Sequence, residues 1–225
     1  MKTKTSLTTN SIKHSPLQRA LLLVLLVLAC FAPSQLTHAQ CPQICDSSSN
    51  TALGIDALFD NTSGFSNSAL GANALFANTT GVGNTATGAL ALPSNTTGSN
   101  NTATGNGALR NNTTANSNTA IGALALLMNT TGSDNTATGD VALEFNTSGN
   151  ANTANGALAL NANTTGSNNT ATGGTALQNN TTGNDNTATG YQALVSNTTG
   201  VDNTATGSGA LFINSSGNAN TATGP

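Results

Sequence analysis

The sequence predicts an all-β protein, a β-solenoid of ten 17-residue coils. The unit Asn-Thr-Ala-x-Gly-x-x-Ala-Leu-x-x-Asn-Thr-Thr-Gly-x-x repeats over residues 50–219 without insertion or deletion. Gly and the Asn-Thr-Thr-Gly run return too often for a helix of useful length to persist. The 225-residue chain also has 24 Gly, no Trp and only 6% charged residues, which no ordinary globular core resembles.

Residues 1–39 have the pattern of an export signal. Basic residues from Lys2 to Arg19 precede an apolar run from Ala20 to Phe31, and small or polar residues lead to a predicted cleavage site after Ala39. The apolar run is shorter than the ~20 residues that span a bilayer as a helix. We therefore expect cleavage and a secreted or outer cell-surface location; a retained anchor and lipid attachment at Cys30 are the alternatives.

Residues 40–49 form a short N-terminal segment that contains Cys41 and Cys45. An oxidising compartment would permit a disulfide between them or a bridge between chains. Their C-x3-C spacing differs from the redox C-x-x-C motif, and no His follows residue 38 to complete a zinc site. A structural bridge is the interpretation we favour.

Within each unit, the elements follow in a fixed order. A β-compatible stretch, Asn-Thr-Ala-x, is followed by a Gly corner, a second stretch around Ala-Leu and a polar Asn-Thr-Thr-Gly turn. The fifth position is Gly in every copy, which predicts a positive φ or a close backbone approach there. The fifteenth position is Gly except at Ala115, which indicates a softer constraint. Residues 220–225 begin an eleventh copy and stop within it, as a piece of a longer protein would.

The inward-facing positions are predicted to be the third (Ala), the eighth (Ala) and the ninth (Leu) of each unit. Burying one Leu and two Ala is a small gain against the entropy of ordering a whole coil. Further burial between chains is therefore expected, and we predict a homotrimer. The predicted core ladder is Leu58, Leu75, Leu92, Leu109, Leu126, Leu143, Leu160, Leu177, Leu194 and Leu211.

At Asn-Thr-Ala-x-Gly-x-x-Ala-Leu, residues 50–224 resemble the head domains of bacterial trimeric autotransporter adhesins and related repeats in surface proteins and phage tail fibres. The resemblance implies a left-handed parallel β-roll in which three chains pack their apolar ladders centrally, and it implies adhesion. The 17-residue unit is longer than is usual in those heads. The resemblance covers the head repeats and does not extend to the stalk, membrane-anchoring barrel or C-terminal chaperone domain of that family.

Composition argues against catalysis and against nucleic-acid binding. From residue 40 onward there is no His or Lys, so acid–base and nucleophilic chemistry has few groups to use. One basic and eight acidic residues give this part a formal charge of −7, which is unsuited to phosphate. We expect no enzyme activity, cofactor, bound metal or small-molecule substrate. Calcium binding at Asp134, Asp185 and Asp202, which share the seventeenth position, is a weaker alternative to solvated turn carboxylates.

The leading functional interpretation is therefore a secreted or cell-surface structural and adhesive module with a distributed polar surface. Its expected partners are extracellular matrix, a glycan or another cell surface. Each unit also has an Asn-x-Ser/Thr sequon at its twelfth position, from Asn61 to Asn214. We interpret these asparagines as turn residues that favour the left-handed region, with glycosylation as the alternative.

Ice binding by a threonine face is the alternative function. Positions two and four are both Thr in most units, so stacked coils would align two ranks of hydroxyls on one face. Position four is Leu53, Leu70, Ile121 or Asn155 in the remaining units, and Thr is also common in ordinary strands. The candidate ice-binding residues are Thr85, Thr87, Thr102, Thr104, Thr136, Thr138, Thr170, Thr172, Thr187, Thr189, Thr204 and Thr206.

Overall fold

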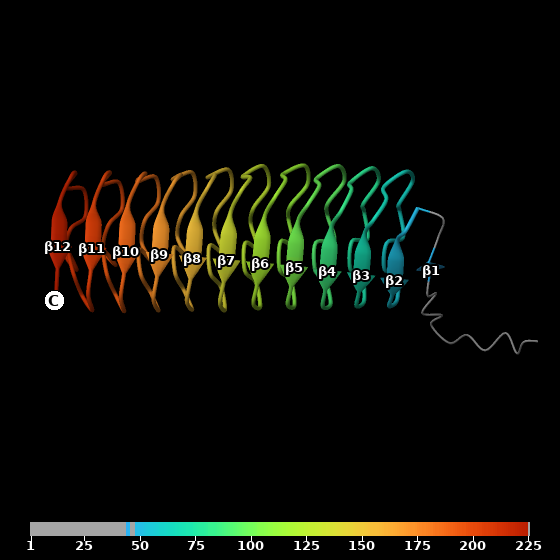
Figure 1. The fold of residues 1–225 in the computed structure, drawn as a ribbon, viewed down its shortest axis with the longest axis horizontal. Coiled ribbons are helices and arrows are strands. Elements are labelled where there is room, and N and C mark those ends of the chain that lie inside the picture. Colours follow the sequence, from blue (N-terminus) through green and yellow to red (C-terminus); the bar gives the residue numbers. More distant parts are fainter. Residues whose placement is uncertain (1–43, 46–47, 225) are drawn as a thin grey trace, which may run out of the picture. The chain divides into compact units, whose positions relative to one another are not determined.

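The computed structural model describes residues 44–45 and 48–224, which form a parallel β-solenoid with one short strand per coil (Figure 1). Within these ranges no helix is long and apolar enough to cross a membrane. The strands are β1 (Ile44–Cys45), β2 (Thr51–Leu53), β3 (Ser68–Leu70), β4 (Thr85–Thr87), β5 (Thr102–Thr104), β6 (Thr119–Ile121), β7 (Thr136–Thr138), β8 (Thr153–Asn155), β9 (Thr170–Thr172), β10 (Thr187–Thr189), β11 (Thr204–Thr206) and β12 (Thr221–Thr223).

The strands form a single sheet whose order follows the chain from β1 to β12. Strands β2 to β12 are parallel, and each residue pairs with the residue 17 positions later, as Ala188 pairs with Ala205. Strand β1 is antiparallel to β2 and pairs Ile44 with Ala52. The repeat length thus sets the register, and every unit meets its neighbours through the same positions. The predicted solenoid with about ten coils of 17 residues is confirmed.

Each strand ends after three residues because the fifth-position Gly turns the chain. These glycines have φ between 127° and 145° in the ten complete units, where L side chains are strained. A Cβ at Gly122 would lie 2.3 Å from the carbonyl oxygen of Gly139 in the next coil. Both reasons predicted for this position, a positive φ and a close approach, are confirmed.

The second stretch, around Ala-Leu, is a tight turn and not an extended segment. The ninth-position Leu residues have φ between 50° and 55°, in the left-handed region. Short-range bonds close the turn: the N–H of Ala125 donates to Gly122 (3.5 Å), and the N–H of Asn129 donates to Leu126 (3.2 Å). The N–H of Leu126 instead reaches the carbonyl of Ala142 in the next coil (3.0 Å). This turn aims the Leu side chain at the strand.

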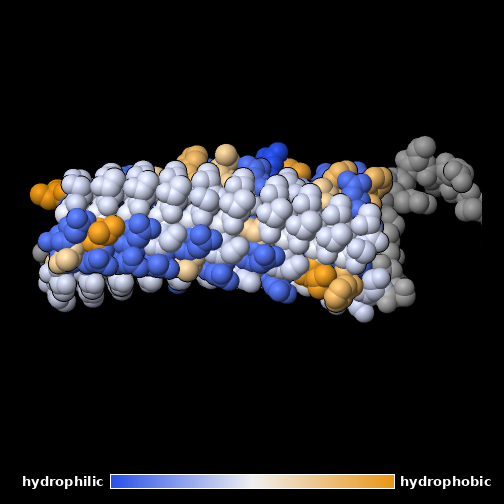
Figure 2. Space-filling view, turned by 90° about the horizontal axis from the view of Figure 1, so that it is seen from above, coloured by the Kyte–Doolittle hydropathy of each residue, from blue (hydrophilic) through white to orange (hydrophobic). Residues whose placement is uncertain are grey.

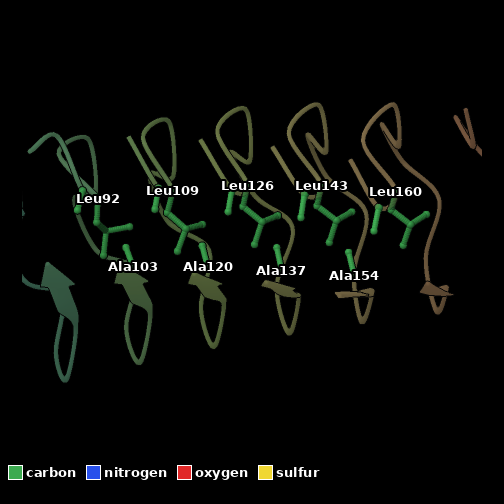
Figure 3. Packing of buried hydrophobic residues seen from close by; sticks show 14 of the residues in the cluster. Leu92, Ala103, Leu109, Ala120, Leu126, Ala137, Leu143, Ala154 and Leu160 are labelled. Carbon is green, nitrogen blue, oxygen red and sulfur yellow. The ribbon is translucent and has the colours of Figure 1, made fainter. Parts of the chain in front are cut away.

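The core consists of the three predicted ladders. From coil two to coil nine the ninth-position Leu side chains are fully buried, and the third- and eighth-position Ala side chains are at most 1% exposed. Leu58 in the first coil is 7% exposed, and Leu211 in the tenth is partly buried. Figure 3 shows Leu and strand Ala side chains pointing toward one another inside each coil. The prediction of the inward face is confirmed.

Burial inside one chain changes the expected basis of the trimer. The sequence-based expectation placed the apolar ladders of three chains around a common axis. The stacked coils of a single chain already cover these side chains completely, as they do Leu126 and Ala137, so they are not available to other chains. Association between chains would have to use the outer surface. The trimer and the left-handed sense stay predictions.

Candidate functional site

Two ladders of buried asparagine side chains run along the interior, and sequence reasoning missed both. The Asn residues at the first and twelfth positions are buried in nearly every coil. At the twelfth position, Nδ2 of Asn129 donates to Oδ1 of Asn112 in the preceding coil (2.9 Å). At the first position, the backbone N–H of Asn135 donates to Oδ1 of Asn118 (3.0 Å). We call these two ladders the asparagine spine.

The two ladders meet at the carbonyl oxygen of the fifteenth residue. The oxygen of Gly132 accepts from Nδ2 of Asn118 (2.9 Å) and from Nδ2 of Asn129 (2.8 Å). Among the described residues, no buried side-chain nitrogen or oxygen lacks a partner. Because unpaired buried amides are costly, this complete pairing lets a polar interior stabilise the coil.

The asparagine spine also explains the fifteenth position. A Cβ at Gly98 would lie 2.4 Å from Oδ1 of Asn95 and 2.4 Å from the carbonyl oxygen of Ala115, so the spine and the next coil leave little room there. Unlike the fifth-position glycines, these glycines do not have a positive φ. Ala115 is accepted with 2% exposure, and its carbonyl still binds Asn101 and Asn112. The softer constraint predicted here agrees with a backbone that other residues can adopt.

The sequon asparagines differ from their predicted role. None of them has a positive φ. The residues with positive φ are at the fifth, seventh, ninth and seventeenth positions. Asn78, Asn95 and their equivalents through Asn197 are fully buried, and their Nδ2 atoms already donate two hydrogen bonds each, as at Asn95. Glycosylation of these nitrogens would require the coil to open, so the folded array is a poor acceptor.

The outer face of the sheet carries the predicted threonine ranks. Side chains at positions two and four are exposed or half-exposed on every described strand from β2 to β12, while the Ala between them points inward. Pairing in register sets Thr187 beside Thr204 and Thr189 beside Thr206. All twelve candidate ice-binding threonines lie in these ranks, on β4, β5, β7, β9, β10 and β11. Strands β9 to β12 form the longest uninterrupted run of Thr-Ala-Thr.

The threonines of the Asn-Thr-Thr-Gly turn differ from those of the strands, because they form hydrogen bonds between coils. The hydroxyl of the first of them donates to the backbone carbonyl of its equivalent in the next coil, as Oγ1 of Thr164 does to Thr181 (2.9 Å). This bond recurs from Thr62 to Thr198. The turn is therefore held by side-chain bonds between coils, and hydroxyls at this position are engaged in stacking.

A third surface is the edge formed by the seventh, tenth and eleventh positions, which we call the variable edge. Its residues differ from coil to coil and include charged, aromatic and aliphatic side chains. Figure 2 shows strongly hydrophilic and strongly hydrophobic side chains mixed along both borders of a face of regular, pale ranks. In the second and third coils the variable edge is hollowed by a groove of about 510 Å³.

The remaining predicted sites are placed as follows. Asp134, Asp185 and Asp202 lie exposed on turns with φ between 56° and 61°, a conformation that Asp tolerates better than most residues. In the described part of the chain, no three His, Cys, Asp or Glu side chains come together as a metal site would require. Cys45 belongs to β1, and Cys41 lies outside the described residues, so the disulfide stays a prediction.

Comparison with protein-family models, with curated proteins and with solved structures finds no match to this chain. The function must therefore be argued from the surfaces described above.

Proposed function

We propose that this chain is a structural and adhesive module outside the cell, which binds its partner through many weak contacts spread along the stacked coils. The observation that carries this proposal is the exact 17-residue register of the sheet, which repeats the same outward polar positions on neighbouring strands. Repeated weak contacts on one rigid body add up to strong attachment by avidity. Extracellular matrix, a glycan or another cell surface are the proposed partners.

The charge and side-chain distribution of the described coils supports a role in binding rather than chemistry. Their ionisable groups are seven scattered carboxylates, Arg110 and Tyr191. The proposal therefore assigns the chain no catalytic step, no cofactor and no small-molecule substrate. The proposed location outside the cell rests on the signal-like segment 1–39.

Surface binding with graded substitutions tests the adhesive proposal. The full chain would be applied to immobilised matrix preparations and to a glycan array, with retention measured against bare supports. Replacing Thr187 alone by Ala should change retention little, whereas replacing Thr170, Thr187, Thr204 and Thr221 together should weaken it roughly tenfold or more. Retention equal to bare supports on every surface would contradict adhesion, and loss of all retention on one substitution would contradict a distributed surface.

Ice binding is the second candidate function, and the in-register threonine ranks of β9 to β12 favour it. Parallel pairing spaces the hydroxyls of one rank by ~4.8 Å, and alternate residues of a strand by ~6.6 Å, so a flat and regular lattice faces the solvent. A thermal hysteresis measurement tests this candidate. Hysteresis that is lost in Thr189→Lys would support ice binding, and the absence of hysteresis at high protein concentration would exclude it.

A further inference from the structure

The groove in the variable edge is an apolar feature of the outer surface that is not part of the proposed adhesive ranks. Phe59 lies at its border, stacked on Phe76 with ring centroids 5.4 Å apart and planes 5° apart, and it is 66% exposed. Exposed apolar side chains that lie together like this gain free energy when a partner covers them. The groove is lined by Asn73, Phe76, Ala77, Leu90, Pro93 and Ser94.

Opposite charges lie in the coils on either side of the groove. The first coil contributes Asp56 and Asp60, and the fourth contributes Arg110, which is the only basic residue after Arg19. All three side chains are exposed. Backbone hydrogen bonds join neighbouring coils along the groove: the N–H of Asp60 donates to the carbonyl of Phe76 (2.9 Å), and the N–H of Ala77 donates to the carbonyl of Pro93 (2.9 Å). The groove therefore has an acidic end and a basic end.

This arrangement is complementary to itself. A two-fold axis that crosses the groove between coils two and three, within the plane of contact, places the first coil of one chain opposite the fourth coil of the other. The acidic and basic ends are three coil spacings apart, ~14 Å, in both chains, so the match holds at both ends. The operation sets Asp56 and Asp60 of each chain opposite Arg110 of its partner and closes the apolar groove in the middle.

We propose that a second copy of this chain docks antiparallel on the groove of coils one to four and forms a two-fold dimer. The apolar centre, from Phe76 to Pro93, would supply the burial, and the charged ends would fix the register and orientation. The contact uses the outer surface and leaves the buried Leu ladders untouched, in contrast to the trimer expected from the sequence. It does not depend on the adhesive function.

A second register is disfavoured by the partners of Glu144. A two-fold axis at the fifth coil would place Arg110 opposite Glu144 of the sixth coil. Glu144 is half-buried and already accepts from Nδ2 of Asn161 (3.0 Å), whereas Asp56 and Asp60 are exposed at the groove. Glu144→Lys is therefore a matched control for a charge reversal elsewhere on the same edge.

Sedimentation equilibrium of the full chain, as the host processes it, tests the dimer. Reductant excludes bridges through Cys41 and Cys45. The parent chain should be a dimer that weakens as salt rises. Asp56→Lys/Asp60→Lys and Arg110→Asp should each raise the dissociation constant roughly tenfold or more, since like charges then face each other. An equimolar mixture of these two variants should restore association, because each chain then presents the charge that its partner lacks.

Several results would overturn the proposal. A monomeric or trimeric parent chain would do so, and so would charge-reversed variants that dimerise as the parent does or a mixture that fails to associate. Glu144→Lys should leave the dissociation constant within roughly twofold; if it alone breaks the dimer, the fifth-coil register is correct and ours is wrong. Circular dichroism establishes that each variant is folded. Should Arg110→Asp not fold, Arg110→Gln should still weaken the dimer, and unchanged association in that variant would equally refute the contact.

Discussion

The interior of the coil and the variable edge belong to the same 17-residue unit, yet they differ in what they allow. Inside, the first, third, fifth, eighth, ninth and twelfth positions keep one residue type in every complete unit, and their side chains or backbones touch the next coil. On the variable edge, by contrast, a single position such as the tenth is occupied by Phe, Pro, Arg, Leu, Glu, Asn, Gln or Val in different coils. Stacking restricts the residue types of the interior, because each coil packs against a copy of itself, and it leaves the residue types of the edge free to vary.

The largest expected effect comes from a charge in the Leu ladder. Leu126→Asp should lower the free energy of unfolding by ~3–5 kcal/mol, because it buries an unpaired carboxylate in the middle of the core. Met128→Asp, two residues away and 38% exposed, is the matched control and should cost well under half of that. Urea unfolding followed by circular dichroism measures both. If Leu126→Asp unfolded like the parent chain, the assignment of the interior would be wrong.

The two glycine positions separate backbone constraint from simple crowding. Gly122→Ala should cost ~2–3 kcal/mol, because φ is 138° and the added Cβ would lie 2.3 Å from a backbone oxygen. Gly132→Ala places its Cβ equally close to a backbone oxygen, 2.3 Å from that of Gly149, but keeps an ordinary φ, and Ala115 occupies the equivalent place, so we expect ~1 kcal/mol. Thermal melts of the two variants give the order. Equal losses would show that crowding alone decides both positions.

Removing one amide from the asparagine spine should have an intermediate effect. Asn129→Ala deletes the bonds to Asn112 and Gly132 and removes one of the two acceptors of Nδ2 of Asn146, at a cost of ~2 kcal/mol. Asn179→Ala, at an exposed eleventh position, is the control and should change stability by less than ~0.5 kcal/mol. Urea midpoints of the two variants measure the difference. Matching midpoints would mean that the interior asparagines contribute no more than surface ones.

The smallest effect is expected on the variable edge itself. Phe145→Ser changes a side chain that is 46% exposed and should alter the free energy of unfolding by less than ~0.5 kcal/mol. The melting temperature of the variant, compared with that of the parent chain, measures this change. A loss comparable to that of Asn129→Ala would show that the edge supports the fold and is not reserved for partners.

The repeat allowed the fold to be predicted from the sequence, but only at positions where the residue type itself indicates burial or a backbone constraint. The Leu ladder and the constraint at Gly122 could be inferred because an apolar or Cβ-free residue that recurs in every coil must meet its own copy. The left-handed φ of Leu126 could not, since that region is unfavourable for a large side chain and is forced here by the turn.

Asn129 was assigned to a turn because Asn is a common turn residue. Its burial follows only from register, which brings Asn112 and Asn146 within hydrogen-bonding distance. The groove beside Phe76 was equally out of reach, because it depends on how side chains of different size stand in adjacent coils. The threonine ranks, by contrast, could be predicted from the alternation of side chains along a strand alone. They lie on the outer face, as that alternation predicts.

The asparagine spine repeats nearly the same interior hydrogen bonds at each boundary between coils. The number of coils can therefore change without a new kind of interior contact. Loss of residues 169–185, one whole unit, would bring Asn186 next to Asn152, with the same donors and acceptors that now join Asn169 to Asn152. Unequal recombination between nearly identical units would therefore lengthen or shorten the array in steps of ~4.8 Å. Where the units gained or lost lie beyond the fourth coil, the first four coils and the groove they carry would keep their sequence.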